Sequence, residues 1–263
     1  MDFLSSARCW NGLYAAARRC DGGCTARRPR WRNARPDPRL FAGFSCFGDN
    51  FDVLRNGLRH VRFIGGGSGS GKSTVARLLA AKHGFRLYHS ERFSEYAART
   101  TPDDAPLLHA FVAMDMDERW LNRPPDVMRD TFHGFQGEGF HLVIDDLLAL
   151  PSSPPVLVEG FTLLPRLVAP LLTRRNQAVW LIATPEFRRA AFDSRGSTYD
   201  IPGKASDPER ALANLLERDR LFSEDVTREA SAFRLPVIHV ELGTSVDQLA
   251  SGVSEALGLN DLS

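Results

Sequence analysis

The stretch GGSGSGKST, residues 66–74, decides the fold of this chain. It matches the pattern G-x-x-x-x-G-K-[S/T] at every fixed position, and the apolar run Val61–Ile64 comes before it. Glycines allow the backbone to turn so that several N–H groups point inward, and the start of a helix adds positive potential at the same place. A buried strand, this loop and a following helix are therefore expected to form a cradle for phosphate groups.

The residues expected to contact a bound nucleotide are those of the loop itself: Gly66, Gly67, Ser68, Gly69, Ser70, Gly71, Lys72, Ser73 and Thr74. Lys72 is expected to neutralise the β- and γ-phosphates, and the Ser73 hydroxyl is expected to ligate Mg²⁺. Lysine occurs only at positions 72, 82 and 204 in this arginine-rich chain, which makes Lys72 stand out. ATP and Mg²⁺ are the predicted cofactors.

Short apolar runs alternate with helical patterns on both sides of the loop. This alternation predicts βαβ units, and hence a parallel sheet covered by helices on both faces. The expected strands are Val61–Ile64, Arg86–His89, Val156–Val158, Ala178–Ala183 and Val237–Val240. The expected helices are Thr74–His83, Leu107–Arg119, Phe132–Leu150, Pro208–Ala232 and Ser245–Leu257.

Composition is that of an ordinary globular protein. Of the 263 residues, 43% are hydrophobic and 25% are charged, with a net charge of +1. This balance gives no reason to expect nucleic acid or an anionic membrane as a partner. No run of roughly 18 apolar residues occurs, so no membrane span is expected, and a cytoplasmic location is predicted.

The first 58 residues differ in character from the rest. Residues 1–60 carry 11 arginines, no lysine and 5 acidic residues, and hold all four cysteines, Cys9, Cys20, Cys24 and Cys46. A zinc site is conceivable, but the irregular spacing and the lack of histidine among them favour plain thiols. We expect residues 1–58 to be a disordered extension and residues 59–263 to be the folded domain.

Residues 61–260 resemble the P-loop kinase group that includes nucleoside monophosphate, shikimate, gluconate and uridine kinases. The resemblance covers about three-quarters of the chain and is specific at the phosphate loop. It implies an α/β three-layer sandwich whose five-stranded parallel sheet has the order 2-3-1-4-5. It also implies a helical substrate insert at 93–153 and a lid at 188–220.

The acid that would support Mg²⁺ has two candidates. The run Pro155–Gly160 ends in Glu159-Gly160 and resembles the corresponding strand of uridine kinases and phosphoribulokinases, so Glu159 is preferred as the metal-side acid with Ser73. The rival pair is Asp145 and Asp146, which follow the apolar residues 142–144. Their neighbours fit a helical stripe, and a solvated helix face accounts for them equally well.

The second predicted strand ends at His89-Ser90-Glu91-Arg92. In the resembling kinases this end faces the phosphate acceptor, often with an aspartate that activates its hydroxyl. Here Glu91, or else Ser90, is offered for that role, and Glu91 is the predicted base. Arg92 is a candidate for holding an acidic group of the substrate.

Arginines from the lid region are expected to stabilise the transferring phosphate. Among the candidates, Arg189 and Arg220 are preferred, and the full set is Arg188, Arg189, Arg195, Arg218 and Arg220. The alternative for each is an exposed helix residue paired with a neighbouring glutamate.

The favoured function is an ATP-dependent kinase with a small-molecule acceptor that the sequence does not name, and the oligomeric state stays open. Two alternatives also stay open: a nucleotide-binding regulatory ATPase without a small acceptor, and a toxin-like kinase of sugar nucleotides. A GTPase is disfavoured, because no Asn-Lys-x-Asp occurs and Asp200–Gly203 follows the fourth predicted strand rather than the third.

Overall fold

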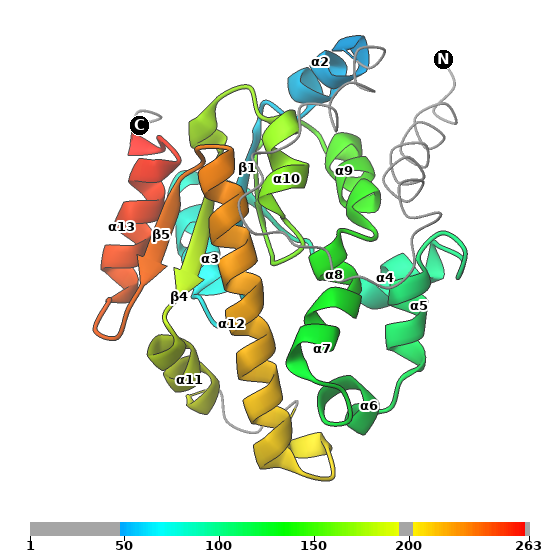
Figure 1. The fold of residues 1–263 in the computed structure, drawn as a ribbon. Coiled ribbons are helices and arrows are strands. Elements are labelled where there is room, and N and C mark those ends of the chain that lie inside the picture. The colour runs from blue at the N-terminus through cyan, green and yellow to red at the C-terminus, as the bar shows by residue number, and fades with distance from the viewer. Residues whose placement is uncertain (1–47, 195–201, 261–263) are drawn as a thin grey trace. The chain divides into compact units, whose positions relative to one another are not determined.

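The computed structural model describes residues 48–194 and 202–260, and residues Asp49–Ser263 make up one compact unit (Figure 1). The four cysteines lie outside the described residues, so the thiol and zinc interpretations stay predictions. Residues 1–47 of the predicted extension also lie outside the described residues, whereas its last residues form helix α2 (Gly48–Gly57). Within the described ranges, no helix combines the length and apolar character needed to cross a bilayer.

The core is a five-stranded parallel sheet with the order β2-β3-β1-β4-β5. This confirms the predicted fold class and strand order. The strands are β1 (Val61–Gly66), β2 (Arg86–His89), β3 (Val156–Glu159), β4 (Ala178–Ala183) and β5 (Val237–Val240). The central strands β1, β3 and β4 are buried along their whole length, as expected for a parallel sheet covered on both faces.

Helices cover the two faces of the sheet. On one face α3 (Lys72–His83) and α13 (Val246–Ala256) pack their apolar residues onto Ile64, Leu157 and Leu181. On the other face the long helix α12 (Pro208–Ala232) crosses β4 and contacts α10 (Pro165–Val168), as Figure 1 shows in front of the sheet. On that side Trp180 is fully buried, and its indole N–H donates to the carbonyl of Leu163 at 2.8 Å.

A run of short helices connects β2 to β3 and forms the insert. They are α4 (Phe93–Ala98), α5 (Pro106–Ala113), α6 (Met116–Trp120), α7 (Pro125–Thr131), α8 (His133–Gln136) and α9 (Phe140–Ala149). Helix α11 (Pro185–Asp193) follows β4, and 3-10 turns lie at Ala169–Leu171, Arg175–Gln177 and Pro202–Lys204.

Two predicted helices of the insert are each broken in two. The helix expected at 107–119 is interrupted before Asp115, whose side chain caps α6 and forms a reciprocal capping box with Glu118. The helix expected at 132–150 is interrupted by Gly137 and Gly139, which have φ values of 86° and 80°. Left-handed glycines end α-helices, so these expectations were wrong in extent.

Candidate active site

The phosphate loop joins β1 to α3 through three glycines with positive φ: Gly66 (120°), Gly69 (74°) and Gly71 (83°). A Cβ atom on Gly66 would lie 2.0 Å from the carbonyl oxygen of Leu181, so no other residue fits there. Gly71 precedes the first residue of α3 and has no side chain that could cap the helix. The N–H groups of the first turn of an α-helix have no partner within the helix, and a helix start of this kind suits an anion.

The loop is held in shape by side chains of its own. Ser70 donates its hydroxyl to the carbonyl of Gly67 at 2.8 Å, and the Lys72 ammonium donates to the same carbonyl at 2.7 Å. Both side chains are buried. The ammonium therefore lies across the loop, in contact with the carbonyl of Gly67.

Glu159 ends β3 beside the loop. The sheet register places it next to Ile64 on β1 and His89 on β2. Its Oε1 atom accepts the Ser73 hydroxyl at 2.9 Å and lies 2.6 Å from Nδ1 of His89. The structure thus brings together the two residues that were predicted to support Mg²⁺.

Ser73 and Glu159 fit a magnesium site of the nucleotide-dependent kind. Mg²⁺ prefers oxygen ligands, is bound through one or two protein groups, and takes the rest from water and substrate phosphates. Across the described residues no cluster of three or more His, Cys, Asp or Glu side chains forms a cage of its own. A hydroxyl and one buried carboxylate beside a phosphate loop suit a metal that arrives with the nucleotide.

The rival acids Asp145 and Asp146 lie on α9. Asp146 accepts the hydroxyl of Tyr88 at 2.7 Å and pairs with Arg99 at 2.7 Å. These contacts tie the insert to β2, and they involve no residue of the phosphate loop.

The carboxylate of Glu91 lies just beyond β2 and accepts the backbone N–H of Phe161 at 2.9 Å. The residue as a whole is exposed, but burial of its carboxylate raises the pKa of Glu91. Nearby Lys72 and His89 oppose that shift in pKa, whereas the charge of Glu159 adds to it. Glu91 therefore lies close enough to Lys72 and Glu159 for their charges to shift its pKa.

The two neighbours of Glu91 are occupied by structural contacts. Ser90 is fully buried, and its hydroxyl lies 2.6 Å from that of Thr162. Arg92 pairs with Glu95 and with Asp146, so its guanidinium is engaged on the surface of the insert.

The preferred lid arginines do not contact the loop in this structure. Arg189 is exposed and pairs with Asp193 at 3.1 Å, and Arg220 pairs with Glu217 and Glu224. Their phosphate role stays a prediction that depends on lid movement. Arg195 lies outside the described residues.

Among the described candidate arginines, Arg188 reaches the loop. It is 1% exposed, and its Nε–H donates to the carbonyl of Ser68 at 3.2 Å. The sequence favoured Arg189 over Arg188, although Arg188 belonged to the wider set of candidates.

Arg218 lies in the aromatic core of the insert. Its guanidinium carbon is 4.9 Å from the ring centres of Trp120 and Phe132 and 5.0 Å from that of Phe135. It is paired with Asp219 at 2.6 Å, and both side chains are buried. Trp120, Phe132 and Phe135 are therefore part of the buried core of the insert.

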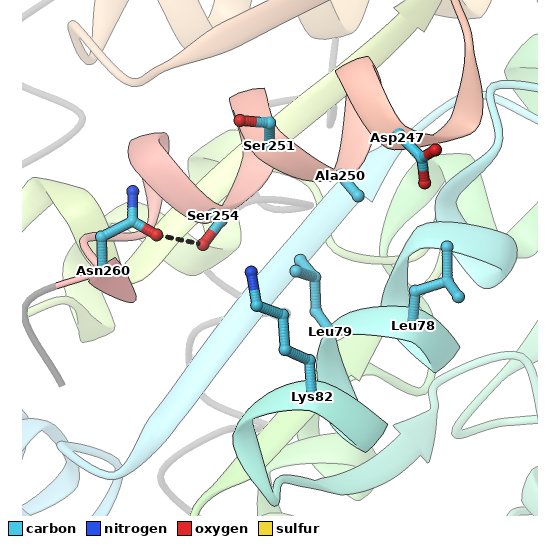
Figure 2. Close-up of a pocket in the computed structure, with 8 residues that line it drawn as sticks. All are labelled: Leu78, Leu79, Lys82, Asp247, Ala250, Ser251, Ser254 and Asn260. Carbon is cyan, nitrogen blue, oxygen red and sulfur yellow. Dashed lines mark hydrogen bonds between the residues drawn. The ribbon is translucent and has the colours of Figure 1, made fainter. Parts of the chain in front are cut away.

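A cavity of about 340 Å³ lies away from these residues, between α3 and α13 (Figure 2). Its polar lining includes Lys82 and Asp247, together with Ser251, Ser254 and Asn260. Its lining includes no residue of the phosphate loop.

Comparisons with known proteins find distant similarity to solved structures and no match of other kinds. No protein-family model matches the chain, and the search of curated proteins finds no match. Similar solved structures include thymidylate kinase from Candida albicans, at 13% identity and a TM-score of 0.41, covering 76% of this chain and 92% of that one.

Two further structures are similar at the same 13% identity. An uncharacterized protein from Eubacterium ventriosum has a TM-score of 0.39 over 76% of this chain and 98% of its own. The YorR protein of Bacillus subtilis, in complex with phosphorylated GDP, has a TM-score of 0.35 over 77% of this chain and 98% of its own. Sheet order and phosphate loop together are consistent with an α/β fold of the P-loop kinase kind.

Proposed function

We propose that this protein transfers the terminal phosphoryl group of a nucleoside triphosphate, with ATP as the expected donor, to a hydroxyl group of a small molecule. The observation that carries the proposal is the gathering of Lys72, the Ser73–Glu159 pair and Glu91 at one edge of the sheet. Each of these groups suits a separate part of phosphoryl transfer.

The donor phosphates are held by the loop. Its inward N–H groups and the start of α3 bind phosphate oxygens, and the Lys72 ammonium exchanges the carbonyl of Gly67 for the β- and γ-phosphates. Ser73 and Glu159 would hold Mg²⁺, which when bound neutralises charge on the phosphate oxygens.

The acceptor is activated from the other side by Glu91. A hydroxyl beside Glu91 passes its proton to the carboxylate as its oxygen forms a bond to the γ-phosphorus. The bridging bond between the β- and γ-phosphates breaks, and its electron pair leaves with the nucleoside diphosphate. A raised pKa makes the Glu91 carboxylate a better proton acceptor than an ordinary glutamate.

The proposal is tested by measuring nucleoside diphosphate release from ATP and from GTP, with pooled nucleosides, nucleotides, sugars, sugar nucleotides and amino-alcohols. The Lys72→Ala variant should abolish any stimulation by a pool. Lys82→Ala is the matched control, because Lys82 belongs to the same helix but lies outside the site.

The pools also separate the remaining alternatives. Stimulation by sugar nucleotides alone would favour the toxin-like kinase. Nucleotide binding that needs Lys72, with no pool raising turnover, would favour a regulatory ATPase. A wild-type protein that binds neither ATP nor GTP would refute the proposal.

A further inference from the structure

Arg188 reaches the outer side of the phosphate loop from α11. Its Nε–H donates to the carbonyl of Ser68 at 3.2 Å, while one Nη atom donates to the Ser223 hydroxyl at 2.6 Å and to the carbonyl of Ala183 at 3.4 Å. A single guanidinium thus joins the loop, the end of β4 and helix α12.

The loop and this arginine are in close contact. A Cβ atom on Gly69 would lie 3.2 Å from Cγ of Arg188, and one on Gly67 would lie 3.4 Å from its Nη2 and 2.9 Å from the hydroxyl of Ser223. Both the stem and the head of the side chain therefore press against the loop from outside.

The contact with Ser68 determines where a neighbouring N–H points. In a planar trans peptide the C=O and the following N–H point in opposite directions. An arginine that holds the Ser68 carbonyl outward therefore turns the N–H of Gly69 inward, toward the space where phosphate binds. This is the orientation that an anion nest requires.

Burial and the need for hydrogen-bond partners restrict the orientation of the Arg188 guanidinium. It is 1% exposed, and burial lowers the pKa of Arg188, although the charge of Asp219 opposes this. Asp219 acts on Arg218 as well as on Arg188, because its Oδ1 accepts both Nε–H and Nη–H from Arg218. A buried cation needs its hydrogen bonds, so the planar fork of Arg188 is held in one orientation.

We propose that Arg188 is a positioning residue for the phosphate loop, which it holds in the nucleotide-binding shape before any nucleotide arrives by fixing the Ser68 peptide. The affinity part of this proposal rests on the nucleotide binding proposed above. The part that concerns loop shape does not, and both parts are measured.

Three variants make the test. Arg188→Lys keeps the charge but loses the fork that bridges Ser68 and Ser223. Ser223→Ala removes one anchor of the arginine and leaves the loop residues unchanged. Arg228→Met is the control, because Arg228 lies on α12, its side chain is 72% exposed, and it pairs with Asp225.

The first measurement needs no ligand. In protein labelled with ¹⁵N-glycine, Arg188→Lys and Ser223→Ala should shift the amide signals of Gly67, Gly69 and Gly71, and the control should leave them in place. Unshifted loop glycines in both variants would overturn the proposal. Should Arg188→Lys fail to fold, Ser223→Ala decides the outcome.

The second measurement is the dissociation constant of a fluorescent ATP analogue, with circular dichroism to verify folding. Arg188→Lys should weaken binding at least about tenfold, and Ser223→Ala should weaken it by a smaller factor. Wild-type affinity in Arg188→Lys would mean that only charge matters, and the positioning role would fall. A wild-type protein that binds no nucleotide defeats the proposed function, while the glycine signals still decide on the positioning role.

Discussion

Acid should destabilise this protein through one buried histidine, His133. The side chain is 1% exposed, and its Nε2 atom is buried without a hydrogen-bond partner in the described part of the chain. Aromatic rings enclose it, with the centres of Phe93 and Phe132 at 4.5 and 4.7 Å. Burial, assisted by the positive charge of Arg218, lowers the pKa of His133 from 6.5 to about 4.

The size of the effect follows from that shift in pKa. Between pH 6.5 and about 4 the unfolded chain carries a proton on this histidine and the folded chain does not. Stability therefore falls as the pH falls through this window, because protons favour the state that binds more of them. One pKa unit corresponds to about 1.4 kcal/mol, so the shift from 6.5 to about 4 amounts to about 3 kcal/mol.

The assay is urea unfolding followed by tryptophan fluorescence at several pH values from about 7 to about 4. His133→Phe and His133→Gln are compared with wild type, because neither replacement titrates although one is apolar and the other polar. Burial also lowers the pKa of His60, His83 and His141, and their contributions cancel in the comparison. If wild type and both variants lose stability in parallel, the reasoning is refuted.

Four other substitutions should have distinct effects. Gly66→Ala should lower the free energy of unfolding by more than about 3 kcal/mol, because its Cβ would lie 2.0 Å from the Leu181 carbonyl oxygen. Gly84→Ala, at φ 68° with open space around it, should cost only about 1 kcal/mol, and thermal unfolding compares the two. Glu159→Gln should reduce the Mg²⁺-dependent gain in nucleotide affinity about tenfold by titration calorimetry, and an unchanged gain would remove it from the metal site. Glu91→Gln should slow turnover about 10²- to 10⁴-fold without changing the nucleotide dissociation constant, and weaker nucleotide binding instead would argue against its role as a base.

Much of the fold could be predicted from contiguous stretches of the sequence. The loop at residues 66–74, the five apolar runs and their spacing specify the parallel sheet, because its central strands are buried on both faces and each crossover needs a helix. Helix ends in the insert were harder to place. Gly137 and Gly139 end one helix and start another, but a glycine within an apolar helical pattern is also tolerated inside a helix at modest cost.

The candidate site shows the same division between local and distant information. Glu159 could be predicted because it ends a strand next to the loop, and the parallel register then carries it to Ser73. Arg188 and Arg189 are adjacent, and one residue along a helix turns the side chain by about 100°, so one faces the loop and the other faces solvent. Which of them faces inward depends on how α11 packs against a loop 120 residues earlier. A local pattern carries no information on that contact, so the sequence could point to arginines in this segment but not to the one that reaches the loop.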